Sequence, residues 1–301
     1  MMVKIAVAAA LLFAASAVPA RSQAPAAQDV QVTITKLAGN VYGIDGQGGR
    51  ISALVGPDGV FLVDAQFPQV TEKIIAALKT VSDGRVKMIV NTHVHGDHTG
   101  GNENFGKMGT VIMSRPNLRA RLIKPAPGAN GQVPPSAPAA ALPVITYDQP
   151  LTIQFDGEEV RIIPLPPSHT DGDTAVKFVN ADVLATGDVF RSTGFPNIDR
   201  ANGGTLKGLL ESMDTFIALS GPNTKVVPGH GDVTNRAGLV AHKEVIITVR
   251  DRVSKQMKEK KTLDQIVASK PTADFDAKVG LASTSADRFV QQLYAELRAG
   301  R

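Results

Sequence analysis

Short runs of apolar residues, interrupted by Gly, Pro and Asn, dominate the first third of the sequence. Such runs, rich in β-branched residues and bounded by turn formers, predict β-strands. The expected strands are Val30–Leu37, Val41–Ile44, Ile51–Val55, Val60–Asp64 and Val86–Val90. Before the last of them, the segment VTEKIIAALKTV at Val70–Val81 carries apolar residues at helical spacing, which predicts a helix.

The second half of the chain repeats this alternation of strand-like and helix-like segments. Further strands are expected at Ile145–Tyr147, Leu151–Phe155, Val160–Pro164, Thr174–Val179 and Val183–Thr186. Helical patterns follow at Leu206–Leu219, Leu239–Glu259, Leu263–Ser269 and Ser285–Leu297. Blocks of strands alternating with helices indicate a layered α/β architecture, and we expect residues 30–301 to form a single domain.

One stretch between these halves, Pro116–Pro143, is rich in Pro, Ala and Gly. Such a composition cannot build a core, which favours a surface linker. Long structureless loops inside compact domains are also frequently lids, which favours a flap beside a functional site. The sequence leaves both interpretations open.

The N-terminal residues Met1–Ala20 have the layout of a secretory signal peptide: Lys4, an apolar run, and small residues near Ala20. The apolar run is short for a membrane span, so we expect no stable membrane insertion after cleavage. Cleavage after Ala20 lowers the formal charge from +4 to +3, and cleavage after Ala24 also removes Arg21 and leaves +2. Residues 21–29 then form a flexible mature terminus, and the expected location is periplasmic or secreted.

The composition excludes several kinds of chemistry. With 43% hydrophobic and 20% charged residues, the chain is typical of a globular protein with a sizeable core. It has no cysteine, which excludes thiolate metal ligands and a cysteine nucleophile. The mature charge is mild and there is no dense Lys/Arg block, so no nucleic-acid partner is expected.

The segment NTHVHGDHTGG, which begins at Asn91, holds three of the six histidines of the chain. His93 and His95 are two residues apart on a loop, so both imidazoles can turn towards one ion. Asp97 and His98 can reach a second position beside it. Imidazole and carboxylate are the ligands that zinc uses when cysteine is absent.

Three distant residues extend this cluster. His169 lies in PPSHTDGD, Asp188 in LATGDVF and His230 in VVPGHGDVT, each in a turn after a strand-like run. Only His242 falls inside a helical pattern. Any one of these histidines alone would be interpreted as a structural residue, but the set predicts a metal site at the ends of several strands.

The order H-x-H-x-D-H, then a single His, then an Asp, then a final His resembles the pattern of the metallo-β-lactamase superfamily. The resemblance extends from about Val30 to the last helix. It implies an α/β fold of four layers, the αβ/βα sandwich, in which two mixed sheets pack face to face with helices outside. The metals of such a fold lie at one edge of the sandwich.

The resemblance also implies roles for individual residues. His93, His95 and His169 would bind a first zinc ion, Asp97, His98 and His230 a second, and Asp188 would bridge the two. A pair of Zn²⁺ ions can hold a hydroxide that attacks a carbonyl, with Asp97 orienting it or passing a proton to the leaving group. Asp64, in FLVDA, matches an acidic residue behind the metal loop of the family. It would either support a ligand from outside the metal shell or cap the end of its strand.

The resemblance defines the chemistry better than the substrate, which we expect to be a small molecule. Export and the lactamase-like motifs favour a β-lactam, and Arg191 lies where one lactamase subclass meets the carboxylate of the drug. Arg191 could equally be a solvated charge at a strand end. Asp188 at the bridging position departs from true lactamases and favours a lactone, ester or thioester hydrolase, similar to glyoxalase II, with weak promiscuous β-lactamase activity.

Other classes of function are less compatible with these residues. Di-iron redox relatives carry a Glu where this chain has His95, and a non-catalytic zinc-binding protein would use a His-rich tract or a closed site. Export and the absence of a basic stripe also disfavour a nuclease. The oligomeric state is left open by the sequence.

Overall fold

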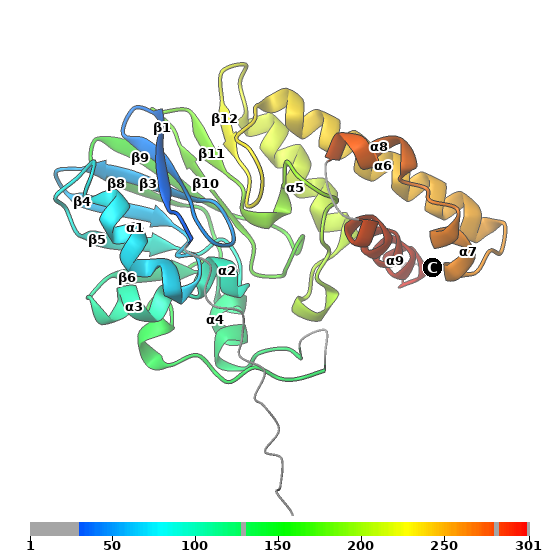
Figure 1. Cartoon of the computed structure of the whole chain (residues 1–301), viewed down its shortest axis with the longest axis horizontal. Coiled ribbons are helices and arrows are strands. Elements are labelled where there is room, and N and C mark those ends of the chain that lie inside the picture. Colours follow the sequence, from blue (N-terminus) through cyan, green and yellow to red (C-terminus); the bar gives the residue numbers. More distant parts are fainter. Residues whose placement is uncertain (1–29, 128–130, 280–282, 300–301) are drawn as a thin grey trace, which may run out of the picture. The chain divides into compact units, whose positions relative to one another are not determined.

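Two β-sheets packed face to face form the centre of the fold (Figure 1). The computed structural model describes residues 30–127, 131–279 and 283–299. Contacts divide the chain into the units Met1–Val30 and Gln31–Arg301, and every described helix and strand belongs to the second unit. The predicted signal peptide (1–20) and flexible terminus (21–29) lie outside the described residues.

The first sheet has seven strands, which lie side by side in the order of the sequence. They are β1 (Thr33–Ala38), β2 (Val41–Asp45), β3 (Ile51–Gly56), β4 (Gly59–Val63), β5 (Val86–Val90), β6 (Val111–Ser114) and β7 (Ile145–Thr146). Strands β1 to β4 pair antiparallel, whereas β4, β5, β6 and β7 pair parallel. The sheet is therefore mixed, and its parallel half is the one that carries functional loops at its carboxyl edge.

The second sheet has five strands in the order β12-β11-β10-β9-β8. They are β8 (Leu151–Phe155), β9 (Glu158–Pro164), β10 (Thr174–Phe178), β11 (Val183–Ala185) and β12 (Lys225–Val227). All neighbours pair antiparallel except β11 and β12, which are parallel. Parallel neighbours end at the same edge of a sheet, so the loops after β11 and β12 meet there.

The inner faces of the two sheets share one hydrophobic core. Phe61 of β4 has no exposed surface, and its ring lies 5.9 Å from that of Phe155 and 6.4 Å from that of Phe178, on the opposite sheet. Rings at these separations, tilted or edge-on, pack favourably. These contacts join the inner faces of the two sheets.

Helices cover the outer faces of both sheets (Figure 1). On the first sheet lie α1 (Thr71–Leu78) and α3 (Asn102–Lys107); on the second lie α5 (Leu206–Leu219) and α6 (Arg236–Lys258). The remaining helices are α2 (Gly96–Thr99), α4 (Pro116–Ile123), α7 (Leu263–Ala268), α8 (Ala273–Val279) and α9 (Ser283–Ala299). The predicted four-layer αβ/βα sandwich is confirmed. Among the described residues, no helix is both long and apolar enough to cross a membrane.

Most predicted elements occur where the apolar pattern placed them. Val86–Val90, Leu151–Phe155 and Leu206–Leu219 have the predicted bounds, and the other predicted elements differ by a few residues at their ends. One difference has a structural reason. The fourth strand ends at Val63, because Asp64 adopts a φ of 70°, which lies outside the β region of backbone conformations.

The interpretation of Pro116–Pro143 as a structureless linker is wrong for its first part. Pro116 is the first residue of helix α4, where its missing N–H and fixed φ are tolerated, and Leu118 is fully buried. The carboxylate of Asp171 accepts hydrogen bonds of 2.7 and 2.6 Å from Arg121, which attaches this helix to the loop after His169. The stretch also contains a turn of 3₁₀-helix, Ala139–Ala141.

Candidate metal centre

Two pairs of parallel strands bring the predicted site residues to one edge of the sandwich. Asp64 follows β4, and the histidine loop follows its parallel neighbour β5. Asp188 follows β11, and His230 follows the parallel neighbour β12. His169 completes the set from the connection between β9 and β10.

The seven predicted ligands form two groups, and within each group the donor atoms lie within 4.8 Å of one another. The first group contains His93, His95, His169 and Asp188; the second contains Asp97, His98 and His230. The resemblance implies the same grouping of the histidines and Asp97, whereas Asp188, expected between the two groups, falls in the first one.

Asp188 lies between the two groups. Its Oδ1 is 3.2 Å from Nε2 of His98, and its Oδ2 is 3.3 Å from Nε2 of His230 and 3.8 Å from Nε2 of His169. A carboxylate in this position contacts donors of both groups. The same Nε2 of His230 lies 3.1 Å from Oδ2 of Asp97, which brings two members of the second group into contact.

The donor atoms fit a metal better than they fit one another. Nε2 of His93, Nε2 of His98 and Oδ1 of Asp188 are buried without a hydrogen-bond partner among the described residues. The last two atoms are only 3.2 Å apart, yet they make no hydrogen bond to each other. Buried polar atoms without partners are unfavourable unless a ligand satisfies them. Nitrogen and oxygen donors converging in this way are suited to divalent zinc.

A glycine provides the space beside these atoms. A Cβ on Gly49, in the loop after β2, would lie 2.4 Å from both Cε1 and Nε2 of His98. No side chain can be accommodated at that distance. Glycine at this position therefore leaves the inner nitrogen of His98 accessible.

Four of the histidines are fixed by a partner on the nitrogen that faces away from the cluster. His93 Nδ1 lies 3.0 Å from Thr92 Oγ1, and His98 Nδ1 lies 2.7 Å from Asp64 Oδ2. In the same way, Asp199 Oδ2 lies 2.7 Å from His95 Nε2, and the backbone carbonyl of residue 197 lies 2.7 Å from His169 Nδ1. Partners of this kind orient a ligating imidazole and determine its tautomer.

Asp64 is the common support of the histidine loop. Its Oδ1 accepts from the backbone N–H of Thr92, and its Oδ2 accepts from Thr92 Oγ1 and from His98, all at 2.7 Å. Because Thr92 Oγ1 donates its hydrogen to Asp64, it accepts from Nδ1 of His93. The structure thus connects Asp64 to two of the predicted ligands. Its positive φ directs the carboxylate towards them.

Two supporting residues were missed at the level of sequence. Asn197 and Asp199 lie in the irregular segment between Phe190 and α5, with no strand or helix pattern around them. Asp199 also accepts from the side chain of Asn202 at 2.6 Å, which holds its carboxylate in place. The only local signal was a set of Asn, Asp and Gly residues that is equally typical of any turn.

The electrostatics of the metal-free cluster differ between its members: burial opposes the charged form of His98 and His230, but the neighbouring carboxylates raise the pKa of both imidazoles, whereas two other histidines stay neutral. Burial, followed by the charges of His98 and His169, holds the pKa of His93 well below its ordinary value. Burial is also the main cause that lowers the pKa of His169 to about 4. Burial alone would raise the pKa of Asp188, but the charge of His98 beside it lowers that pKa well below the usual range. Two neutral imidazoles and an ionised carboxylate are thus present at neutral pH.

Arg191 lies next to this cluster. The residue that follows it, Ser192, donates its backbone N–H to the carbonyl of His230 at 3.0 Å. The positive charge of Arg191 opposes the carboxylates that raise the pKa of His230. The Nε of Arg191 is buried and has no hydrogen-bond partner among the described residues. The residue as a whole is half-buried.

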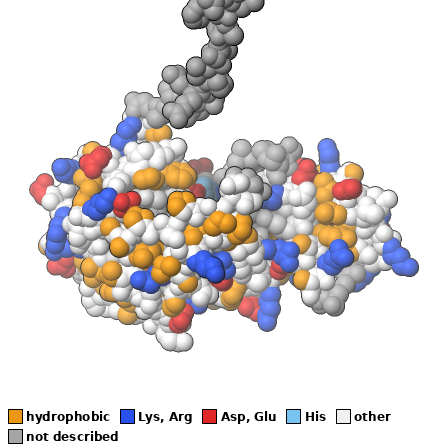
Figure 2. Space-filling model, turned by 90° about the horizontal axis from the view of Figure 1, so that it is seen from below, with side chains coloured by type: hydrophobic (Ala, Val, Ile, Leu, Met, Phe, Trp, Pro, Cys, Tyr) orange, Lys and Arg blue, Asp and Glu red, His pale blue; other side chains and the backbone are white. Residues whose placement is uncertain are grey.

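A cavity of about 670 Å³ opens beside His95. Residues that line it include His95, Arg121, Pro125, Pro134, Asp199 and Arg288. In Figure 2, a small pale-blue area of histidine is visible next to red acidic side chains, within a recess of the surface. Part of the stretch 116–143 lies against this cavity, which supports the flap interpretation for that part.

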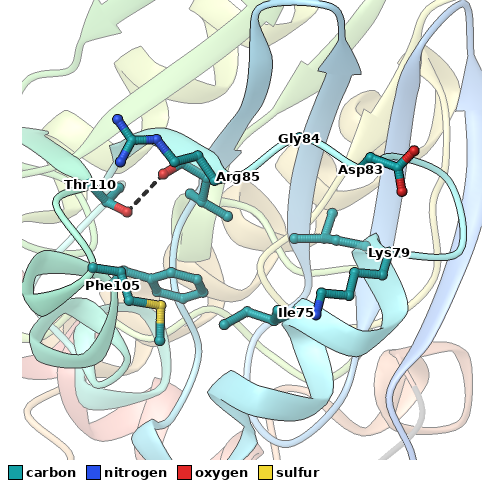
Figure 3. Close-up of a pocket in the computed structure, with 10 residues that line it drawn as sticks. Ile75, Lys79, Asp83, Gly84, Arg85, Phe105 and Thr110 are labelled. Carbon is teal, nitrogen blue, oxygen red and sulfur yellow. Dashed lines mark hydrogen bonds between the residues drawn. The ribbon is translucent and has the colours of Figure 1, made fainter.

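A second, smaller cavity of about 180 Å³ lies elsewhere, between α1, α3 and the start of β5 (Figure 3). Ile75 and Phe105 point into it, and Lys79, Asp83 and Arg85 stand around it. None of the predicted ligands contributes to its lining. This cavity is therefore separate from the candidate metal centre.

Comparisons with known proteins agree with this fold. Among curated proteins, the chain is 25% identical to the metallo-beta-lactamase type 2 of Bacillus cereus over 185 residues, which are 61% of this chain and 67% of the relative. Among solved structures, the metallo-beta-lactamase from Pontibacter korlensis superposes with a TM-score of 0.59 at 19% identity, covering 72% of this chain and 99% of that one.

The inverting sec-alkylsulfatase Pisa1 from Pseudomonas sp. superposes over more of the chain. It covers 87% of this chain with a TM-score of 0.66 at 16% identity, and this chain spans half of its length. The sequence profile of the metallo-beta-lactamase superfamily matches residues 45–230, from the end of β2 to the last predicted ligand. The chain belongs to the metallo-beta-lactamase superfamily.

Proposed function

We propose that this protein is a dinuclear zinc-dependent hydrolase. His93, His95 and His169 would hold one zinc ion, Asp97, His98 and His230 would hold the other, and Asp188, which contacts donors of both groups, would be shared between them. The observation that carries this proposal is the convergence of two adjacent donor groups, each within 4.8 Å, in which three ligand atoms are buried without a hydrogen-bond partner among the described residues. A zinc pair in such a site supplies an activated water and polarises the bond under attack.

Side chains around the proposed metals orient the water and hold the ligating imidazoles in place. The side chain of Asp97 is 21% exposed and therefore reaches the solvent side of the cluster, where it can orient water or pass a proton to the leaving group. Asp64, Asn197 and Asp199 keep the imidazoles in fixed orientations from behind. No serine or cysteine nucleophile is required in this arrangement.

For the substrate we propose a β-lactam as the first class. The likeness to the lactamase of Bacillus cereus supports this choice, and so does the half-buried Arg191 near His230, whose Nε has no partner among the described residues and whose guanidinium can pair with a carboxylate. A lactone, ester or thioester is the second class, favoured by the position of Asp188. A negative charge between the metals reduces the electrophilicity available to open an amide.

The test is steady-state hydrolysis of a chromogenic cephalosporin by zinc-loaded protein, compared with a lactone and a thioester. A lactam kcat/KM of about 10⁴ M⁻¹s⁻¹ or more would establish β-lactamase activity. Brisk ester or lactone cleavage with a far lower lactam rate would establish the second class. Loss of all activity on chelation, restored by zinc, separates both from a non-catalytic zinc-binding protein or an iron redox enzyme.

Two variants connect this activity to the site. His95→Ala should abolish turnover and release the first zinc, and unchanged activity would contradict the ligand assignment. Asp188→Ser, which removes the bridge, should raise the ratio of lactam to ester turnover. An unchanged ratio would show that Asp188 does not determine the substrate class.

We also propose that the protein is exported to the periplasm or secreted. Only the pattern of residues 1–20 supports this, because that segment lies outside the described residues. Fractionation of expressing cells tests it: the mature protein should lack residues 1–20 and appear outside the cytoplasm.

A further inference from the structure

Helix α9 (Ser283–Ala299) lies beyond the segment that matches the superfamily profile, yet it packs against the site. Phe195 and Phe289 stack at 5.8 Å with their planes 16° apart. The amide of Gln292 spans the site loop, accepting from Ile198 N at 3.0 Å and donating to Asn197 Oδ1 at 2.7 Å. The helix is therefore attached to the loop that supports the histidines.

A second pair of contacts strengthens this attachment one turn further along. Glu296 accepts from Arg200 Nε at 2.8 Å and from the backbone N–H of Leu206 at 2.9 Å. Residues four apart share one face of a helix, so Arg288, Gln292 and Glu296 all face the site loop. Arg288 and Gln292 line the 670 Å³ cavity beside His95.

Three arginines line this cavity, and two of them are already paired. Arg121 binds the carboxylate of Asp171 through two hydrogen bonds, and Arg200 pairs with Glu296. Arg288 differs, because its Nε and Nη2 are buried without a hydrogen-bond partner among the described residues. A guanidinium stays charged even when buried, so these N–H groups need an acceptor.

Arg191 places a second positive charge in the same neighbourhood. Burial lowers the pKa of Arg288, the charge of Arg191 lowers it further, and the carboxylate of Asp188 raises it. Nε of Arg191 is also buried and unpartnered among the described residues. Of these two arginines, Arg288 is the one that lines the cavity, so its unpartnered N–H groups are those that an anion bound there can satisfy.

We propose that Arg288 is a specificity residue that binds an anionic group of the substrate in the cavity beside His95, with Arg191 reinforcing its charge. This inference rests on the proposed hydrolase function. The chemistry that Arg288 recognises is an oxyanion, a carboxylate or a sulfonate-like group, on a substrate whose reactive bond lies at the histidine cluster. A planar guanidinium fork binds either group through two hydrogen bonds.

The first experiment compares two esters that differ only in charge: mono(4-nitrophenyl) adipate and its methyl ester, in which the carboxylate is masked. For Arg288→Met we expect kcat/KM of the anionic ester to fall about 10- to 100-fold, the usual effect of a lost charge-assisted hydrogen bond, mainly through KM. Hydrolysis of the methyl ester should stay within about twofold. Arg288→Lys should recover part of the loss, because it restores the charge without the fork.

The matched control is Arg298→Met, at the exposed end of the same helix, which should leave both esters unaffected. Arg191→Met should lower kcat/KM of the anionic ester less than Arg288→Met does. An equal fall for both esters in Arg288→Met would overturn the proposal. So would a loss of discrimination in Arg191→Met alone, with Arg288→Met behaving like the wild type.

A binding measurement separates this proposal from the hydrolase function itself. Calorimetric titration of the zinc-loaded protein with benzoate and with benzenesulfonate should show binding that Arg288→Met weakens about tenfold or more. The probe whose binding is weakened more by Arg288→Met identifies the preferred anion. If the wild type cleaves neither ester but still binds a probe through Arg288, the proposed reaction fails while the anion site stands. If Arg288→Met binds both probes as tightly as the wild type, the anion site fails.

Discussion

Replacement of Asp64 by Asn tests how the outer partner of His98 controls the nitrogen that faces the proposed metals. In the wild type, Oδ2 of Asp64 accepts from His98 Nδ1 and from Thr92 Oγ1, while Oδ1 accepts from Thr92 N. Asn can keep the bond to Thr92 N, and Asn tolerates the positive φ of this position. Its amide NH₂, however, replaces an acceptor by a donor.

This substitution changes the tautomer of His98 and thereby lowers the affinity for the proposed metal. When Nδ1 faces a donor, it must accept, and the ring proton moves to Nε2, the atom that would bind the metal. Partners of this kind contribute about 10- to 100-fold to metal affinity, which is about 1.4–2.7 kcal/mol. The hydroxyl of Thr92 also loses its acceptor, and this lowers the free energy of unfolding of the metal-free protein by about 1–3 kcal/mol.

The assay is competition for zinc between the protein and a chromophoric chelator. We expect Asp64→Asn to bind one equivalent of zinc as the wild type does and the second at least tenfold more weakly. The matched control is Asp182→Asn, because Asp182 has a similar φ of 54° and accepts from Lys177 and Thr224, with no predicted ligand among these partners. Two equivalents bound by Asp64→Asn with wild-type affinity would refute the argument.

Three other predictions concern glycine clearance, pH and the core. Gly49→Ala places a Cβ 2.4 Å from Nε2 of His98, so the purified variant should lose one equivalent of zinc by elemental analysis, and full occupancy would show that the loop simply moves. His242 is buried, and burial followed by the charge of Arg191 lowers its pKa from 6.5 to about 4. Since the unfolded chain binds the proton more tightly, His242 stabilises the fold above pH 6.5 and this stabilisation is lost as the pH falls towards 4. Urea unfolding should therefore show that His242→Leu gains about 2 kcal/mol relative to the wild type between pH 7 and pH 5, and a constant difference would contradict the assignment. Phe61→Ala, which removes a fully buried ring between the two sheets, should lower the free energy of unfolding by about 3–5 kcal/mol, whereas a loss below about 1 kcal/mol would mean that the core refills the space.

The apolar pattern predicted the long elements well because each buries one continuous face. β8 and α5 have the predicted bounds, since their periodicity is supported by the core that they contact. Some of the short elements were not predicted. Strand β6 (Val111–Ser114) and helix α3 (Asn102–Lys107) have too few residues for a period to be distinguished, and pairing with β5 or packing on the sheet stabilises them instead.

The sequence alone determined which residues can bind metal, because histidine and aspartate are chemically restricted and their spacing is specific. His93 and His230 could be identified as partners although 137 positions separate them, since each follows a strand-like run. Only the tertiary structure decided what surrounds them. The carboxylate of Asp199 and the guanidinium of Arg288 acquire their roles through the contacts between α9 and an irregular loop. Such contacts join distant segments through shape and unpaired hydrogen bonds, and these leave no periodic pattern in the chain.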